Sequence, residues 1–219
     1  MAVLFADPAR AAMLDVLMDG REHRAGDLAT RAGVAASTAS GHLSRLLAGE
    51  VVTCVASGRE RRYRLASPAV AHALEALARL APPAPVRSLR SADRAEAVRN
   101  ARTCYDHLAG RLGVRLTDRL LEQRVLVSRG NAYELTRAGA AKLEKLGVDI
   151  ADARERRRQF AFACLDWSEQ RPHLAGALGA ALASALLDQG WVARRTGDRG
   201  LNVTERGRLS LATLGVDLA

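Results

Sequence analysis

The chain has 219 residues, of which 48% are hydrophobic but only 4% aromatic, and its formal net charge is +9 with a pI of about 10.6. A core built mainly from Ala, Leu and Val favours packed helices over extended sheets, and the basic balance favours a polyanionic partner, most often nucleic acid. The three cysteines, Cys54, Cys104 and Cys164, are too widely spaced for a disulfide framework, which argues against a small disulfide-rich secreted domain.

The apolar runs are too short to cross a bilayer, and charged residues interrupt the start of the chain. We therefore expect a cytoplasmic protein that does not associate with membranes. The basic surplus lies in the middle third, because residues 84–158 contain 17 basic and 10 acidic residues. Of the 33 basic residues, 31 are arginine. A codon bias toward arginine would also produce this excess, so we do not take the arginine content as a specific signal for DNA binding.

Three helices are expected in the first 50 residues, because apolar residues recur there at helical spacing and capping residues separate the runs. Proline is favoured at the first helical position and glycine just past the last one. The predicted starts and stops are Asp7–Pro8 and Gly20 for the first helix and Asp27 and Gly33 for the second. The third is predicted to be capped by Ser37 or an adjacent small residue and to end at Gly49.

From residue 51 onward, apolar residues alternate with polar ones instead of recurring at helical spacing. The stretch VVTCVASGRERRYRLA, residues 51–66, predicts two strands joined by a turn at 57–60. Ser67 and Pro68 begin a further helix with apolar residues nearly all round it. The segment PPAPVRSLRS, residues 82–91, has three prolines in four residues, cannot continue a helix, and predicts a linker between domains.

The second half of the chain contains an internal repeat. CYDHLAGRLG, residues 104–113, and CLDWSEQRPHLAGALG, residues 164–179, share Cys-x-Asp and His-Leu-Ala-Gly-x-Leu-Gly once WSEQRP is removed from the second. Three later segments match as well, and each copy reads as helix, strand, turn, strand, helix. The matched segments are Leu120–Val127 with Leu186–Ala193, Tyr133–Gly139 with Leu201–Gly207, and Leu146–Ile150 with Leu214–Leu218.

Helix boundaries are also repeated in the two copies. Thr136 and Thr204 are typical N-caps, and Gly147 and Gly215 are typical C-terminal stops. The sequence therefore predicts two tandem winged-helix-like units, one at 92–151 and one at 152–219.

The order of helix, short helix, third helix and hairpin in the first domain is that of a winged helix-turn-helix. Residues 3–80 resemble the ArsR/SmtB family of bacterial repressors. The resemblance rests on DPARAAMLDVL, on DLATRAGVAASTASGHLSRLLAGEVV and on the Arg-rich wing GRERRYRL. It implies a homodimer on a palindromic double-stranded operator, with the first helix and the helix at 68–81 at the interface, and a response to a small-molecule or metal inducer.

The fold expected for the whole chain is mostly α with three short β-hairpins. Residues 1–81 form the winged helix-turn-helix DNA-binding and dimerisation domain, residues 82–91 the linker, and the two repeats follow.

Candidate DNA contacts lie on the third helix and the wing. A recognition helix needs short polar side chains near its N-terminus, so that the backbone can approach the major groove. Arginines at a wing tip suit phosphate or minor-groove contacts. The predicted DNA-binding residues are Ser37, Thr38, Ser40, His42 and Arg45 on the helix and Arg59, Arg61 and Arg62 on the wing.

The metal sites that the family resemblance implies are incomplete here. The segment REHRAGDL has no cysteine where one of them would lie, and His72 with Glu75 supplies only half of the other. We interpret His72 as a dimer-interface histidine and Cys54 as an inert lone thiol. An inducer site within residues 3–80 is therefore not predicted from metal ligands.

The repeated phrase offers another metal site. Cys104 and His107 are three apart and would share one helical face, and a turn before Pro172 brings His173 back toward Cys164. If a pseudo-twofold axis relates the copies, these residues meet and bind a thiophilic divalent metal such as Zn²⁺. Asp106 or Asp166 would then be an extra ligand or would support a ligating histidine. The predicted ligands are Cys104, His107, Cys164 and His173.

The alternative, which we rank ahead of metal binding, is that the phrase only packs. Cysteine is among the most buried residue types and behaves as a small hydrophobic residue. Leu-Ala-Gly-x-Leu-Gly is typical of a closely packed helix seam. The aromatic residues of this half are likewise interpreted as core anchors, with an organic-ligand pocket as the alternative; they are Tyr105, Tyr133, Trp167 and Trp191.

Functions in other classes are less well supported. The chain has no glycine-rich phosphate loop, no Gly-x-Ser-x-Gly and no His-Glu-x-x-His, so we expect it not to be an enzyme. A thiol-dependent enzyme built on Cys164 and His173 is the remaining catalytic alternative. An architectural or protein-interaction module without an inducer would bind DNA weakly and with little regard to sequence.

Overall fold

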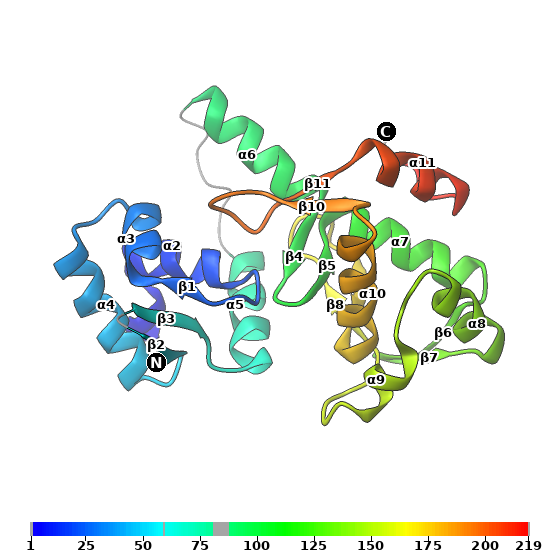
Figure 1. Cartoon of the computed structure of the whole chain (residues 1–219), viewed down its shortest axis with the longest axis horizontal. Helices are drawn as coiled ribbons and strands as arrows, with labels where there is room; N and C mark the ends of the chain where they lie inside the picture. The colour runs from blue at the N-terminus through cyan, green and yellow to red at the C-terminus, as the bar shows by residue number, and fades with distance from the viewer. Residues whose placement is uncertain (1, 59, 81–87, 219) are drawn as a thin grey trace. The chain divides into compact units, whose positions relative to one another are not determined.

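The computed structural model describes residues 2–58, 60–80 and 88–218 (Figure 1). The chain divides into two compact units. Unit 1 comprises Met1–Leu80 with Thr196–Arg199, and unit 2 comprises Ala81–Arg195 with Gly200–Ala219. Each unit is considered by itself below.

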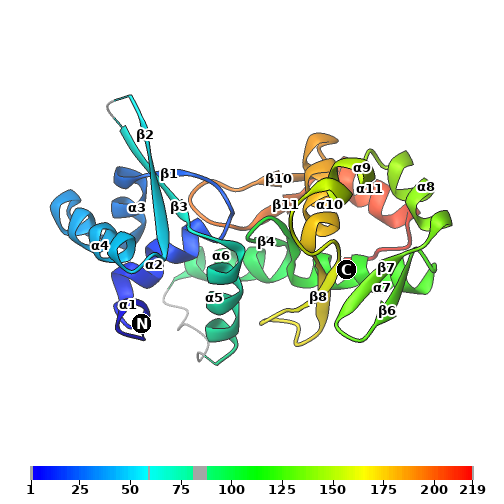
Figure 2. The same ribbon diagram turned by 90° about the horizontal axis from the view of Figure 1, so that it is seen from below.

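Unit 1 is a winged helix-turn-helix. Its sheet is antiparallel with the strand order β1-β3-β2, and β2 and β3 extend past the helices as the wing (Figure 2). Met13, Leu17, Leu28, Leu43 and Leu46 are fully buried and join the helices in one core. The elements are α1 (Ala2–Phe5), α2 (Pro8–Leu17), β1 (His23–Arg24), α3 (Ala25–Ala32), α4 (Ala36–Ala48), β2 (Val52–Ser57), β3 (Glu60–Leu65) and α5 (Pro68–Leu80).

Most predicted boundaries in unit 1 agree with the structure. The Asp7 side chain accepts a hydrogen bond from the backbone N–H of Arg10, and α2 begins at Pro8. Gly33 ends α3 in the left-handed conformation, but α3 begins at Ala25, ahead of the predicted Asp27. The N-cap of α4 is Ala35, which makes no side-chain cap hydrogen bond. Ser37, one of the predicted caps, therefore lies within the first turn of α4, and the cap is a small residue two positions before it.

Unit 2 is a mixture of helices and short antiparallel strands. The strands pair as β4-β5, as β6-β7-β8-β9 and as β10-β11. The elements are α6 (Leu89–Asn100), β4 (Arg102–Cys104), β5 (His107–Ala109), α7 (Gly110–Glu122), β6 (Leu126–Arg129), β7 (Ala132–Leu135), α8 (Arg137–Lys145), α9 (Ile150–Glu155), β8 (Phe162–Leu165), β9 (Pro172–Ala175), α10 (Gly176–Asp188), β10 (Val192–Arg194), β11 (Leu201–Val203) and α11 (Glu205–Thr213).

Both repeats contain the predicted series of helix, strand, turn, strand and helix. The closing helices begin as predicted, because the hydroxyls of Thr136 and Thr204 each accept a hydrogen bond of 2.9 Å from a backbone N–H three residues later. The expected number of hairpins was wrong. Each repeat opens with an additional hairpin, β4-β5 or β8-β9, so the described ranges contain five hairpins rather than three.

The predicted linker 82–91 is also corrected at its C-terminal end. Ser88 is the N-cap of α6 and forms a reciprocal capping box with Ser91, so 89–91 are helical. Residues 82–87 of that prediction lie outside the described residues.

The two repeats share one hydrophobic core rather than forming two separate units. α10 is buried along most of its length and contacts β5 of the first repeat, while α7 of the first repeat contacts β9 of the second. Tyr133 and Trp191 belong to the same core. Because each repeat completes its packing with the other, residues of the two opening hairpins are held close together.

Candidate DNA interface and metal centre

The recognition helix α4 has one buried face and one exposed polar face. Ala39, Leu43 and Leu46 are fully buried against unit 1. Four of the predicted DNA contacts on this helix lie on the opposite, exposed side: Ser37, Thr38, Ser40 and Arg45. This separation anchors α4 through apolar contacts and leaves short polar side chains available to a partner.

His42 differs from the other predicted contacts. Its side chain is only 11% exposed, and its Nδ1 lies 3.2 Å from Arg10 Nη1 and 3.8 Å from Asp7 Oδ1. Arg10 in turn donates to the backbone carbonyls of Leu4 and Val3. His42 is thus packed toward α2, and we now interpret it as a residue that holds α4 in place.

The wing carries an arginine-rich second strand. Arg61 is exposed and Arg62 is half-buried, with its Nη2 3.7 Å from a Glu60 carboxylate oxygen. Arg59 lies outside the described residues. Arg64, which the prediction left out, is also exposed on β3; the signal for it is the same arginine-rich run that identified the wing.

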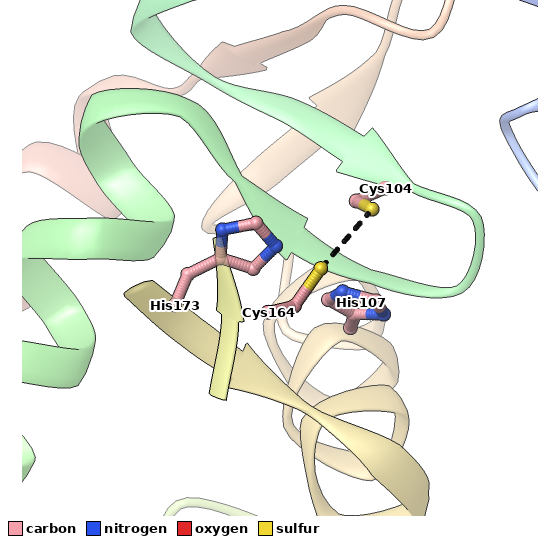
Figure 3. Close-up of side chains that lie close together, drawn as sticks. All are labelled: Cys104, His107, Cys164 and His173. Atoms are coloured by element: carbon pink, nitrogen blue, oxygen red, sulfur yellow. Dashed lines mark hydrogen bonds between the residues drawn. The ribbon is translucent and has the colours of Figure 1, made fainter. Parts of the chain in front are cut away.

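In unit 2 the structure brings the predicted Cys104, His107, Cys164 and His173 together (Figure 3). One potential ligand atom from each residue lies within 4.8 Å of the others. The two Sγ atoms are 4.0 Å apart, and the imidazole centroids are 5.1 Å apart. All four side chains are buried.

The local geometry behind this cluster is not the predicted one. Cys104 and His107 are not on a helical face; they are opposite each other across the β4-β5 hairpin. Cys164 and His173 are opposite each other in the same way across β8-β9. The spacing of three in the first repeat is therefore that of a tight hairpin, and the longer second spacing reflects a longer turn.

Glycines in the repeated phrase let the two copies approach closely. A Cβ atom added at Gly113 would lie 3.6 Å from the Cβ of His173 and 2.5 Å from the carbonyl oxygen of Leu108. At the matching Gly179, it would lie 3.2 Å from the Cβ of His107 and 2.6 Å from the Leu174 oxygen. Each helix therefore needs glycine at this position to accommodate its own hairpin, and the histidine of the other repeat packs against the same position.

A carboxylate accompanies each histidine. Nδ1 of His107 lies 3.3 Å from Asp106 Oδ1, and Nδ1 of His173 lies 3.3 Å from Asp166 Oδ2. Within the described part of the chain, Nε2 of both histidines has no hydrogen-bond partner although it is buried. Each imidazole thus has a carboxylate beside Nδ1 and an unsatisfied Nε2, but only Nδ1 of His107 makes a hydrogen bond to its carboxylate.

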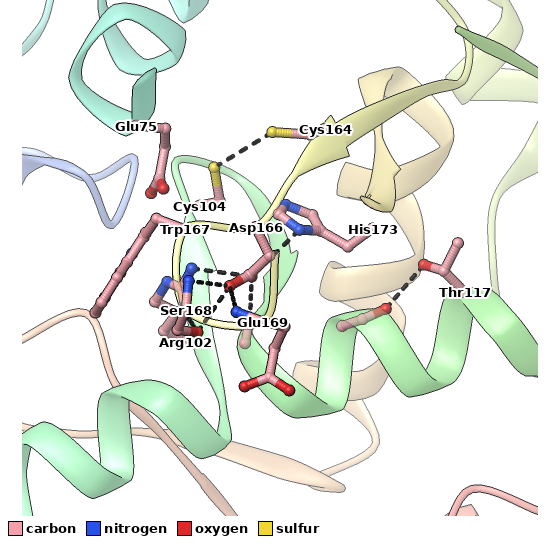
Figure 4. Close-up of polar contacts among 12 residues, drawn as sticks. Glu75, Arg102, Cys104, Thr117, Cys164, Asp166, Trp167, Ser168, Glu169 and His173 are labelled. Carbon is pink, nitrogen blue, oxygen red and sulfur yellow. Dashed lines mark hydrogen bonds and ion pairs between the residues drawn. The ribbon is translucent and has the colours of Figure 1, made fainter. Parts of the chain in front are cut away.

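Asp166 is the most extensively bonded group at this centre (Figure 4). Its Oδ2 accepts hydrogen bonds from Arg102 Nη2 at 2.9 Å and from the Gly110 backbone N–H at 2.7 Å. Its Oδ1 accepts from the backbone N–H and the hydroxyl of Ser168. Burial alone would raise the pKa of Asp166, but the neighbouring His173 and the charge of Arg102 hold that pKa well below its usual range. Sequence reasoning missed Arg102, although Asp166 recurs with the repeated phrase.

The pKa values of the Cys104 thiol and the His107 imidazole are both raised. The hydrogen-bonded contact with Cys164, together with burial, raises the pKa of Cys104 to about 12. Burial lowers the pKa of His107, but the neighbouring Cys104 and Asp106 outweigh it and raise that pKa to about 9.

Comparison with known proteins identifies the class of this chain. It is 42% identical over 207 residues to the HTH-type transcriptional regulator YdfF of Bacillus subtilis strain 168, a match that covers 94% of this chain and 92% of the relative. The chain belongs to the helix-turn-helix transcriptional regulators. This membership confirms the class of protein predicted from the winged-helix motif, and the match covers unit 2 of the regulator as well as unit 1.

Solved structures similar to this regulator cover a smaller part of it. NolR from Sinorhizobium fredii is 31% identical and covers 38% of this chain and 82% of its own, with a TM-score of 0.34. The winged helix-turn-helix domain of Mb0332 from Mycobacterium bovis, described as a possible ArsR-family regulator, is 30% identical over 36% of this chain and 71% of its own, with a TM-score of 0.33. No protein-family model matches the regulator. None of its helices in the described ranges is long and apolar enough to span a membrane.

Proposed function

We propose that this regulator is a homodimeric, ligand-responsive repressor of the ArsR/SmtB type that binds a palindromic operator. The observation that carries the proposal is the two-sided character of α4. Its apolar side is fully buried, while Ser37, Thr38, Ser40 and Arg45 are exposed. A helix of this kind can enter the major groove and read base edges.

The proposed contacts fall into two groups. Ser37, Thr38 and Ser40 are short enough to let the backbone of α4 approach the bases, and Arg45 reaches further to a base or phosphate. Arg61 and Arg62 on β3 contact phosphates, which contributes affinity that depends on salt rather than on sequence.

A second copy of the chain is the proposed partner of α5. The exposed apolar residues Ala69, Ala73, Leu77 and Leu80 recur along one side of this helix, and Leu80 is 83% exposed. Such a stripe is costly in water unless another surface covers it. A twofold dimer formed through α5 would present two α4 helices, and the matching DNA is a palindrome.

Unit 2 is the proposed source of ligand responsiveness. A ligand alters DNA binding only if it has different affinities for the DNA-competent and DNA-incompetent states. In unit 1, Glu75 pairs with Arg199, and within the described residues His72 belongs to no group of three or more potential metal ligands, whereas unit 2 contains a buried cluster of such ligands. Unit 2 is therefore the better candidate for the sensory role.

Selection of DNA from a random pool with the reduced full-length protein tests this function. A repressor should enrich a palindromic sequence and bind it at least about 10³-fold more tightly than random DNA. Thr38→Ala should change the enriched sequence, whereas Arg137→Ala, which removes an exposed arginine of unit 2, should not. Equal affinity for selected and random DNA would instead support an architectural role. Sedimentation of the protein–DNA complex measures whether two chains bind each operator.

A further inference from the structure

We propose that unit 2 binds one thiophilic divalent metal ion, with Zn²⁺ as the best fit, between its two repeats. The ligands are Sγ of Cys104 and Cys164 and Nε2 of His107 and His173. This site does not depend on the function of unit 1, because all four residues belong to unit 2.

The donor set suits zinc in number, chemistry and position. Structural zinc sites are tetrahedral and commonly use two thiolates and two imidazoles, with Zn–S near ~2.3 Å and Zn–N near ~2.0–2.1 Å. Donors around such an ion lie roughly 3–4 Å apart. The 4.0 Å between the sulfurs and the 4.8 Å limit for one donor atom from each of the four residues require only a small contraction. Because four protein donors complete the tetrahedron, the site needs no water ligand.

The buried Nε2 atoms are the observation that packing does not explain. Both lack a hydrogen-bond partner within the described residues, and leaving a buried polar group unsatisfied destabilises the folded state. An apolar side chain at either position would avoid that cost. A bound metal ion removes this cost, because the ion accepts the lone pair of each Nε2 atom.

The carboxylates determine which nitrogen of each imidazole ring is free to bind a metal. A carboxylate near Nδ1 favours the proton on that nitrogen and leaves Nε2 free to ligate, as is usual for metal-bound histidines. Asp106 lies beside His107 and Asp166 beside His173, each at 3.3 Å. Each repeat therefore contributes one cysteine, one histidine and one supporting carboxylate.

Close packing accounts for another part of the repeated phrase. Gly113 and Gly179 are required because an added Cβ would lie 2.5 or 2.6 Å from a backbone carbonyl oxygen of the preceding hairpin. That requirement would be met equally well by an apolar residue at 107 or 173. Packing thus explains the last glycine of His-Leu-Ala-Gly-x-Leu-Gly. The metal explains the histidine and the cysteine that precedes it.

Metal content of the reduced full-length chain, measured after chelation and reloading with Zn²⁺, tests the site. We expect one tightly held ion per chain and a higher midpoint of thermal unfolding than in the metal-free protein. Cys104→Ser combined with Cys164→Ser should lose the ion and the stabilisation. Cys54→Ser, which removes the cysteine of unit 1, should keep both. Equal metal content in the double variant and the wild type would overturn the proposal, as would a reduced wild type that binds no metal.

X-ray absorption by the zinc-loaded wild type keeps the test independent of whether the double variant folds. The expected first coordination shell contains two sulfur atoms near ~2.3 Å and two nitrogen atoms near ~2.0–2.1 Å. A shell without sulfur would contradict the assigned ligands even if one ion were bound.

Discussion

The two units place their polar side chains in opposite ways. In unit 1, Thr38 and Arg45 are exposed on a helix whose other side is core. In unit 2, His107 and His173 are almost completely buried and face two thiols. An exposed polar surface suits a large hydrated partner such as DNA, whereas a closed polar centre has room only for a small ligand. Exposure thus distinguishes the proposed DNA-binding surface of unit 1 from the proposed metal site of unit 2.

The two halves of the buried centre are related but not equivalent. Asp166 is fully buried and pairs with Arg102, which is also fully buried. Asp106 is 29% exposed and pairs with Arg158, which is 24% exposed. The second repeat therefore supplies a deeply fixed carboxylate, and the first supplies one at the edge that water reaches.

Removal of Arg102 should have the largest effect on stability. Arg102→Ala leaves the Asp166 carboxylate buried without its cation, and breaking such a pair costs about 3–5 kcal/mol. Urea unfolding followed by circular dichroism measures the change. Arg158→Ala is the matched control and should cost less, because its partner is partly hydrated. Similar losses in the two variants would remove the proposed difference between the halves.

Weaker metal affinity without loss of the fold is expected for Asp106→Asn. The asparagine no longer provides a charged acceptor for His107 Nδ1, and loss of such support typically reduces metal affinity by about 10–100-fold. Competition with a chromophoric chelator measures the dissociation constant. Asp152→Asn, which alters an exposed carboxylate on α9, should leave it unchanged. An unaltered affinity in Asp106→Asn would show that this carboxylate does not support the ligand.

Two sets of variants in unit 1 should change DNA binding in different ways. Combined Arg61→Ala and Arg62→Ala should weaken binding to all DNA and reduce the salt slope by about one unit per lost phosphate contact. Thr38→Ala should instead change preference among bases by about 1–3 kcal/mol. Fluorescence anisotropy at several salt concentrations separates these effects. If both sets change only the salt slope, α4 is not the reading element.

The helix caps of the repeats should give the smallest effect. Thr136→Ala and Thr204→Ala each remove a hydroxyl that accepts from a backbone N–H at 2.9 Å, which typically costs about 1 kcal/mol. Thermal unfolding of the two single variants compares the copies. Losses that differ by several kcal/mol would show that the closing helices are not equivalent.

Local sequence patterns predicted the winged helix, the repeated helices and their threonine caps, because periodicity and capping act over a few residues. The hairpins β4-β5 and β8-β9 were missed, since strands of three or four residues are too short to show alternation. Repetition of one phrase predicted that four side chains meet, but not the hairpin geometry that brings them together.

Contacts between distant residues set the remaining features. His42 is turned inward by Arg10, 32 residues away, and Asp166 is paired with Arg102, 64 residues away. No local pattern contains this information. The shared core of the repeats has the same origin, because each repeat completes its packing with helices and strands of the other.

Operator binding with and without metal tests most directly whether unit 2 senses a ligand for unit 1. The affinity of the reduced wild type for its selected DNA is measured in metal-free and zinc-loaded forms, beside the variant carrying Cys104→Ser and Cys164→Ser. We predict that zinc lowers the affinity of the wild type by about 5–150-fold, the usual range of allosteric coupling, and leaves the variant unchanged. The same affinity for both forms of the wild type, or the same zinc effect in the variant, would contradict this account.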